Sequence, residues 1–135
     1  MARLIDSSVL IRMERQGLPM DSLATLAEAR EEAAMAAVTV SELVRGILRT
    51  EAGPRRRRRE AFLDAVLDAI PIVSFDLRSA LAYGRLLEDL RGRAIGAHDA
   101  QIAATALAHG YGVLTDNARH FERVEGLDVL VPRWP

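Results

Sequence analysis

The segment RLIDSSVLI, residues 3–11, carries an aspartate, Asp6, in the middle of an apolar run. Its apolar start predicts a short buried strand at residues 3–6, and the residues that follow predict a helix at 8–16. A buried carboxylate that lacks a partner is costly. Asp6 is therefore expected either to cap that helix or to bind a ligand.

Short apolar runs and helix-like segments alternate along the rest of the 135-residue chain. The apolar runs predict further strands at residues 35–38, 71–75, 112–115 and 127–131. The helical spacing of apolar residues predicts helices at residues 22–33, 39–49, 61–70, 77–90 and 98–109. Asp21 and Asp76 are expected to cap two of these helices. This alternation predicts one α/β domain with a mostly parallel sheet and helices on both of its faces.

The composition excludes several classes of protein. Half of the residues are hydrophobic and 27% are charged, as in an ordinary globular domain. All 18 basic residues are arginine, which excludes the lysine-dependent P-loop nucleotidases, haloacid-dehalogenase phosphatases and response-regulator receivers. The absence of cysteine excludes disulfides and thiolate zinc sites. Since the net charge is −1, any affinity for nucleic acid must come from local patches.

The sequence predicts neither a membrane span nor a signal peptide. No window reaches the ~18 apolar residues of a membrane span. Charges are scattered through the first ~25 residues, where a signal peptide needs an apolar core. Because a chain without cysteine is compatible with a reducing compartment, a cytoplasmic location is expected.

Four acidic residues fall where a parallel sheet gathers its ligands. Asp6 and Asp116 follow predicted strands, and Glu42 and Asp99 lie in the first turns of predicted helices. Such positions share one edge of the sheet, so these acids are expected to face one cleft. Four carboxylates in a cleft must protonate or bind a cation, and oxygen ligands favour Mg²⁺ or Mn²⁺ over zinc. The set predicts phosphodiester hydrolysis by a metal-activated water.

Each acid also has a simpler explanation. Thr39 and Glu42 fit a capping box, in which Glu42 bonds back to the start of its helix. Asp99 could be a helix-start acid that the helix dipole favours, and Asp116 could belong to a turn. Asp6 is the hardest to explain in this way, because an apolar strand leads straight into it. The set of four is more specific than any one member.

Three histidines recur every eleven residues, at His98, His109 and His120. The pair His98-Asp99 suggests an HD phosphohydrolase, but that class needs a histidine upstream, and His98 is the first in the chain. The three are expected at a helix start, a helix end and a turn, which is not ligand spacing on one element. They are interpreted as surface or supporting residues, with His98 near the metal.

With these acids in order, the chain resembles the PIN-domain ribonucleases, and within them the VapC toxins of type II toxin–antitoxin modules. LIDSSVLI (residues 4–11) is similar to the first family motif, with Asp6 as its first metal ligand and Ser8 as its small polar partner. VTVSELVRGI (residues 38–47) is similar to the second, with Glu42 as its acid. The resemblance covers nearly the whole chain.

The third stretch of resemblance is IGAHDAQIAATALAHGYGVLTDNARHFERVEGLDVL, residues 95–130. There Asp99 matches the third acid of the family and Thr115 matches the threonine before the last acid. Asp116 falls in the region of the fourth acid, which varies in position and identity among these proteins. Asn117 could therefore share its role.

The resemblance implies a single PIN domain over residues 1–135, with a three-layer α/β/α sandwich around the sheet. It implies a Mg²⁺-dependent endoribonuclease, with Mn²⁺ as an alternative, that cleaves structured RNA such as tRNA or an rRNA loop. It also implies a VapB-type antitoxin that plugs the cleft, and a homodimer. The implied metal ligands are Asp6, Glu42, Asp99 and Asp116, and the implied supporting residues are Ser8, Thr115 and Asn117. The alternatives are a PIN nuclease of RNA processing or DNA cleavage, and a non-catalytic interaction module.

Five consecutive arginines, Arg55, Arg56, Arg57, Arg58 and Arg59, precede the helix predicted at 61–70. They could bind RNA phosphates, or they could form only a solvated helix start. Like charges at a helix amino end oppose the dipole, which favours a contact outside the helix. Trp134 is expected to pack rather than to stack on a base. The leucines of the helix predicted at 77–90 are expected to be core or oligomer contacts.

Overall fold

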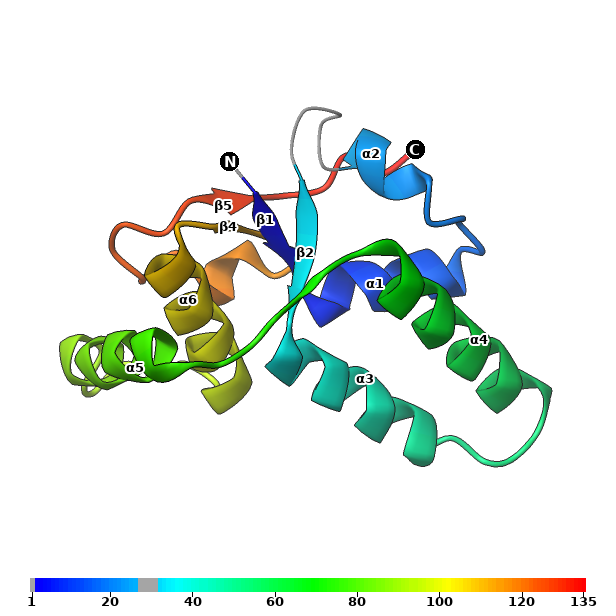
Figure 1. Ribbon diagram of the computed structural model, residues 1–135, viewed down its shortest axis with the longest axis horizontal. Helices are drawn as coiled ribbons and strands as arrows, with labels where there is room; N and C mark the ends of the chain where they lie inside the picture. The colour runs from blue at the N-terminus through cyan, green and yellow to red at the C-terminus, as the bar shows by residue number, and fades with distance from the viewer. Residues whose placement is uncertain (1, 27–31) are drawn as a thin grey trace.

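The computed structural model describes residues 2–26 and 32–135 of the chain. Within these residues, five short strands form one sheet in which every neighbouring pair is parallel. The strands are β1 (Arg3–Ile5), β2 (Ala33–Ala36), β3 (Ile72–Val73), β4 (Gly112–Leu114) and β5 (Val129–Leu130). Their order is β3-β2-β1-β4-β5, so β1 is the central strand (Figure 1). The prediction of a parallel sheet is confirmed.

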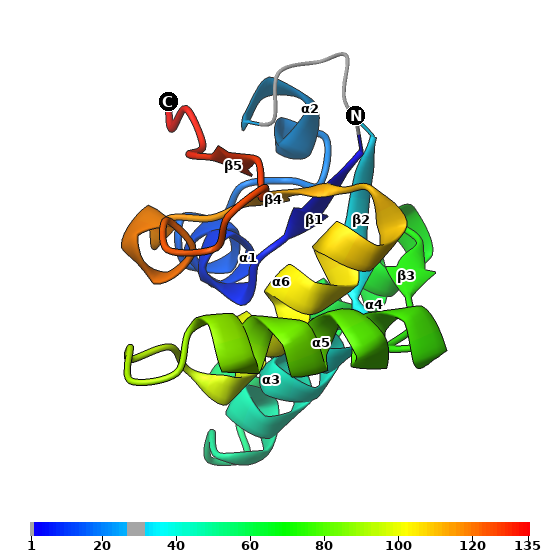
Figure 2. The same ribbon diagram turned by 90° about the vertical axis from the view of Figure 1, so that its left-hand side faces the viewer.

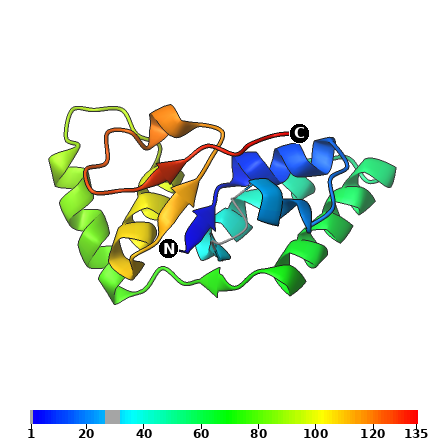
Figure 3. The ribbon, with the colours of Figure 1, turned by 90° about the horizontal axis from the view of Figure 1, so that it is seen from above.

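Helices cover both faces of this sheet. In the described part of the chain they are α1 (Ser7–Arg15), α2 (Ser22–Leu26), α3 (Ala37–Leu48), α4 (Pro54–Ala69), α5 (Leu77–Asp89), α6 (Ala97–His109) and a 3-10 turn, η1 (Ala118–His120). Seen from above, α5 and α6 lie on one side of the sheet, and α1, α2 and α4 lie on the other (Figure 3). This arrangement is the three-layer α/β/α sandwich that the resemblance implies.

Two clusters of buried apolar side chains hold the layers together. Successive side chains of a strand point to opposite faces, so Leu4 packs with α5 and α6, whereas Ile5 packs with α1, α2 and α4. On α6, the side chains of Ala100, Ala103 and Ala104 are fully buried. Their small size lets α6 lie close to the sheet, with α5 packed outside it (Figure 2).

Several predicted boundaries are wrong. The strand predicted at 35–38 is β2, which begins and ends two residues earlier. Ala33 belongs to β2, so the helix predicted at 22–33 cannot reach its expected end; α2 is described to Leu26, and residues 27–31 lie outside the described residues. α3 begins at Ala37, two residues before its predicted start, because a short apolar run fits a strand or a helix equally well. α4 begins at Pro54, since proline is favoured at the first helical position, and the arginine run therefore lies inside the helix.

α5 has the amino-terminal cap that the sequence predicts, but its leucines divide into two groups. The backbone N–H of Ser79 donates to Oδ1 of Asp76 at 2.9 Å, which confirms the cap. Leu86 and Leu90 are buried, whereas three of the predicted apolar positions are exposed: Leu77, Leu81 and Leu87. None of the helices in residues 2–26 and 32–135 combines the length and apolar composition that a membrane crossing needs.

Candidate metal centre

Asp6 leaves the central strand at the carboxyl edge of the sheet. Its backbone N–H donates to the carbonyl of Leu114 at 2.9 Å, so β1 and β4 end side by side. The residue is 4% exposed, and its Oδ2 accepts 2.8 Å hydrogen bonds from both Ser8 Oγ and Thr115 Oγ1. Although Asp6 stands at the N-cap position of α1, its side chain makes no capping hydrogen bond. Of the two expected roles, the structure therefore excludes the cap.

Glu42 reaches the same edge from the second turn of α3. Its Oε2 accepts a 3.3 Å hydrogen bond from Ser7 Oγ and lies 3.6 Å from Nδ1 of His98. Its Oε1 is buried and has no hydrogen-bond partner among the described residues. A buried carboxylate oxygen normally has a partner, and a bound cation would supply one.

The capping-box explanation of Glu42 is wrong. α3 begins at Ala37 and its N-cap is Ala36, so Thr39 lies within the first helical turn and cannot cap. The Thr39 side chain is fully buried, and its Oγ1 has no hydrogen-bond partner among the residues that the structure describes. Glu42 is therefore too far into the helix to bond back to its first N–H groups.

Asp99 lies in the first turn of α6 and completes a group of three acids. A cavity of about 420 Å³ is lined by Asp6, Ser7, Glu42, Gly96, Ala97, His98, Asp99, Asn117 and His120. His120 Nδ1 lies 2.9 Å from Oδ2 of Asp99. His98 is near the acids as predicted, and His120 has one of the supporting positions that the sequence allows. Its contact with Asp99 could not be predicted, because it depends on the path of the folded η1 turn. His109 lies elsewhere and contacts Asp76 at 3.1 Å.

Burial and the repulsion of nearby carboxylates disfavour the charged forms of Glu42 and Asp99. Burial, and then the nearby negative charge of Asp6, raise the pKa of Glu42. The same two causes raise the pKa of Asp99, while His120 opposes them. A cation in this cavity would oppose both effects on the pKa, because a nearby positive charge favours the ionised carboxylates.

The donors fit a hard divalent cation. All three acids offer oxygen, and the unpartnered Oε1 of Glu42 is available for coordination. As they stand, no three His, Cys, Asp or Glu side chains in the two described ranges are arranged closely enough to hold an ion. A cation held by Asp6, Glu42 and Asp99 together would therefore require these side chains to come closer to one another.

Asp116 is turned away from the cavity of the three acids. Its Oδ1 accepts a 2.7 Å hydrogen bond from Trp134 Nε1, and its Oδ2 lies 3.4 Å from Arg12 Nη1. The Arg12 guanidinium lies 4.3 Å from the centroid of the Trp134 ring, so the three side chains form one cluster, named here the C-terminal clamp. Asp116 lines a neighbouring hollow together with Asp99, whereas Asn117 lines the acid cavity itself. Asp116 as a fourth ligand stays a prediction.

The remaining predicted residues separate into two groups. Ser8 Oγ also accepts from the backbone N–H of Asp116 at 3.1 Å, and Thr115 Oγ1 accepts from that of Asn117 at 2.9 Å, so both hydroxyls order the loop after β4.

The arginine run lies on α4, and none of its members lines the acid cavity. Arg59 donates to Thr50 Oγ1 at 2.6 Å. Trp134 packs as expected.

Three comparisons relate the chain to known proteins. The family model described as PIN domain matches residues 3–127. Ribonuclease VapC1 of Rickettsia felis is 33% identical over 132 residues, 96% of each chain. A tRNA(fMet)-specific endonuclease VapC of Shigella flexneri is 32% identical over 95 residues, 69% of this chain and 70% of that protein. The crystal structure of VapBC2 from Rickettsia felis bound to a DNA fragment from their promoter matches all of both chains with a TM-score of 0.83 at 21% identity, which supports the fold.

Proposed function

Because this chain belongs to the PIN-domain family and, within it, to the VapC ribonucleases, we propose that it is a Mg²⁺-dependent endoribonuclease and the toxin of a type II toxin–antitoxin module. The observation that carries the proposal is the cavity in which Asp6, Glu42 and Asp99 converge. Their repulsion would be relieved by a bound cation. Mn²⁺ is the alternative, since it accepts the same oxygen ligands.

In the proposed reaction the three acids hold the cation, which when bound supplies Lewis acidity at the phosphoryl group and a water of lowered pKa. The chain's hydroxyl and imidazole groups fix the orientation of these acids. The pairs are Ser8 and Thr115 with Asp6, Ser7 and His98 with Glu42, and His120 with Asp99. Asn117 lines the cavity and is proposed to orient the substrate or water, and Asp116 remains a candidate fourth ligand.

The proposed substrate is structured cellular RNA, with tRNA as the first candidate and an rRNA loop as the second. The tRNA candidate rests on the relative from Shigella flexneri, whose name states its specificity for tRNA(fMet). The acid cavity opens at the protein surface, since Asn117 and His120 in its lining are exposed. An exposed phosphodiester of a folded RNA could therefore reach it without unfolding of the protein.

The proposed partner is a VapB-type antitoxin. An apolar groove of about 220 Å³ lies between α1, α3 and α4 and is lined by Ile11, Glu14, Arg15, Glu42, Leu43, Gly46, Ile47, Arg59, Phe62 and Leu63. Because Glu42 lines both the groove and the acid cavity, a chain seated in the groove would reach the metal centre. This continuity supports an antitoxin that plugs the cleft.

Two further properties follow from the family resemblance. We propose a homodimer, for which Leu48 and Leu77 supply exposed apolar surface, with 64% and 74% of each residue exposed. We also propose a cytoplasmic location, where cellular RNA is found. The mass of the purified protein in solution, measured by light scattering, tests the first property.

RNA cleavage by the purified chain tests the proposed activity. With tRNA and rRNA as substrates, we expect cleavage in Mg²⁺ and no cleavage in EDTA. Asp6→Asn and Asp99→Asn should abolish it, because each removes a ligand charge, whereas Asp64→Asn, an exposed acid on α4, should cut like wild type. Failure of the wild type to cut with either cation, or cleavage by Asp6→Asn at the wild-type rate, would overturn the proposal. A short upstream reading frame for a DNA-binding protein would support the toxin role.

A further inference from the structure

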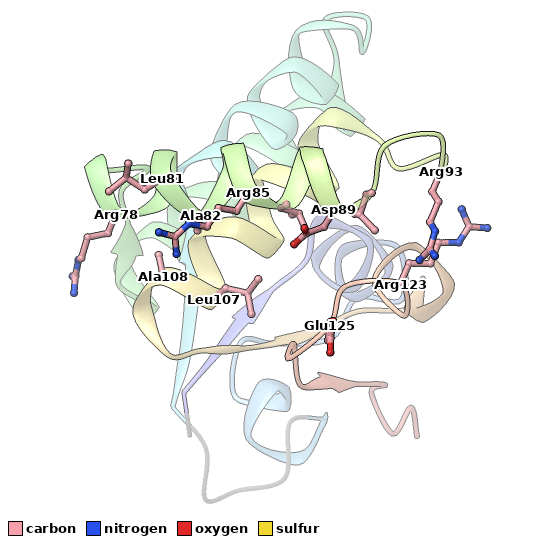
Figure 4. Close-up of a pocket in the computed structure, with 12 residues that line it drawn as sticks. Arg78, Leu81, Ala82, Arg85, Asp89, Arg93, Leu107, Ala108, Arg123 and Glu125 are labelled. Carbon is pink, nitrogen blue, oxygen red and sulfur yellow. The ribbon is translucent and has the colours of Figure 1, made fainter.

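A second, more basic groove lies on the other side of the molecule from the arginine run. It has a volume of about 740 Å³ and runs between α5, the end of α6 and the segment at 123–125 (Figure 4). Four arginines line it, against two acids, Asp89 and Glu125. The arginines are Arg78, Arg85, Arg93 and Arg123. This positive excess is local, because the whole chain carries a net charge of −1.

The cationic ends in this groove are largely available to a ligand. The side chains of Arg85 and Arg93 make no hydrogen bond or ion pair with any residue that the structure describes. Arg123 donates one bond from Nη1 to the carbonyl of Ala94 at 3.1 Å, which leaves its other N–H groups free to bind. Of the four arginines, only Arg78 contacts polar side chains in the described ranges, those of His109 and Asp76.

The groove is continuous with the metal centre. A hollow of about 880 Å³ between them shares Arg123 with the groove, and it shares Asp99, Asn117 and His120 with the acid cavity. The same hollow contributes another arginine, Arg119, whose side chain has no partner in the described part of the chain. A line of arginines therefore leads from the acids over η1 and along α5.

We propose that this basic groove binds the phosphates of the RNA strand as it leads away from the cleaved bond, an inference that rests on the proposed function. Phosphate contacts of this kind position a substrate without reading its sequence. The floor of the groove is aliphatic, with Leu86 and Leu90 buried beneath it, and no aromatic side chain is found among its described lining residues. The described lining of the groove therefore has no surface on which bases could stack, and the groove recognises the charged phosphates of the RNA backbone.

The double variant Arg85→Gln/Arg93→Gln tests the groove through RNA binding. Affinity would be measured by fluorescence anisotropy in EDTA, so that no RNA is cut, with single-stranded RNAs of about 5 and about 15 nucleotides. Two lost phosphate contacts should reduce the slope of log affinity against log salt by about 1.4 for single-stranded RNA. The ratio of wild-type to variant RNA affinity should then fall about sevenfold between about 50 and about 200 mM salt. The loss should be larger for the longer RNA.

Two further variants serve as controls for this test. Arg85→Lys/Arg93→Lys preserves both charges and should restore the wild-type salt slope. Arg91→Gln is the matched control, because Arg91 lies beside the groove, pairs with Glu88 at 3.4 Å and does not line it. It should bind both RNAs like wild type.

An unchanged salt slope in the glutamine variant, an equal loss in Arg91→Gln, or a change in oligomeric mass of the glutamine variant would each overturn the proposal. Binding and cleavage are measured separately, so the two proposals can fail separately. Groove-dependent binding by a wild type that cuts no RNA would overturn the nuclease and keep the groove. Metal-dependent cleavage together with RNA binding that does not depend on the groove would overturn the groove and keep the nuclease.

Discussion

Ser8 and Thr115 are 107 positions apart in the sequence, yet both donate 2.8 Å hydrogen bonds to the same oxygen of Asp6. Two bonds at Oδ2 fix the plane of the carboxylate and leave Oδ1 with a set direction. Supporting hydrogen bonds of this kind orient metal ligands before the ion arrives. In the proposed site the two hydroxyls would contribute orientation, whereas Asp6 would contribute charge.

Thr115→Val should separate these two contributions. Valine keeps the shape of threonine but removes the donor, so we expect Mg²⁺ affinity or cleavage to fall about 10–100-fold while the fold is retained. Calorimetric titration of Mg²⁺ and RNA cleavage would measure the two effects. Thr105→Val is the matched control, since Thr105 is equally buried and, among the residues that the structure describes, its Oγ1 bonds only to the carbonyl of Gln101, at 2.8 Å. It should lose about 1 kcal/mol of stability and keep activity; equal losses of activity would contradict the positioning role.

Glu42→Gln should leave the protein at least as stable as wild type when no metal is present. Burial and Asp6 both disfavour the charged form of Glu42, so neutralising it relieves an unfavourable interaction, and the amide can still accept a bond from Ser7. The variant should lose the Mg²⁺-induced rise in melting temperature and most of the cleavage. Thermal unfolding in EDTA and in Mg²⁺ would show this, with the exposed Glu88→Gln as control. Metal binding and cleavage at wild-type levels would reduce the site to Asp6 and Asp99.

At the scale of elements, the junction between β2 and α3 shows what a sequence pattern leaves open. The alanines at 33, 34, 36 and 37 fit a strand or a helix, so the pattern cannot place the boundary. The pairing of β2 with the central strand places it, since Arg3 lies opposite Ala33 and Leu4 opposite Ala34. The earlier start of α3 is what puts Glu42 in the second turn and removes the capping-box alternative.

The cap of α5 should make stability depend on acid pH. The hydrogen bond from the Ser79 backbone lowers the pKa of Asp76 from 3.8 to about 2. A carboxyl whose pKa is lower in the folded state stabilises the protein above the unfolded value, and this contribution is lost as pH falls through the folded value. Asp76→Asn should therefore lower the urea midpoint at pH 7. The difference in urea midpoint between the variant and wild type should become smaller as the pH falls from about 4 to about 2. Asp68→Asn, an exposed acid on α4, should show no such narrowing.

At the scale of the whole molecule, the part of the site that could be predicted is the part that topology determines. Asp6 follows a strand, and Glu42 and Asp99 lie in the first two turns of helices that start at the same edge, so a parallel sheet brings them together. The direction of Asp116 could not be predicted in this way. It depends on the C-terminal clamp, in which a distant side chain, Trp134, offers a hydrogen bond that no periodicity reveals. The approach of His120 to Asp99 likewise depends on the path of an irregular turn.

The C-terminal clamp ties the end of the chain to α1 and to the loop after β4, and it makes a prediction about the fourth acid. Since Asp116 bonds to Trp134 at 2.7 Å and does not line the acid cavity, Asp116→Asn should reduce Mg²⁺ affinity much less than Asp99→Asn does. Trp134→Phe keeps an aromatic ring beside Arg12 but removes the N–H donor, so it should cost about 1 kcal/mol of stability and leave Mg²⁺ affinity near wild type. Urea unfolding and calorimetric titration of the three variants would measure both quantities. If Asp116→Asn instead loses as much Mg²⁺ affinity as Asp99→Asn, Asp116 must leave the C-terminal clamp when the cation binds. In that case Trp134→Phe should bind Mg²⁺ more tightly than wild type, because Asp116 no longer has to break its hydrogen bond to Trp134 before it reaches the cation.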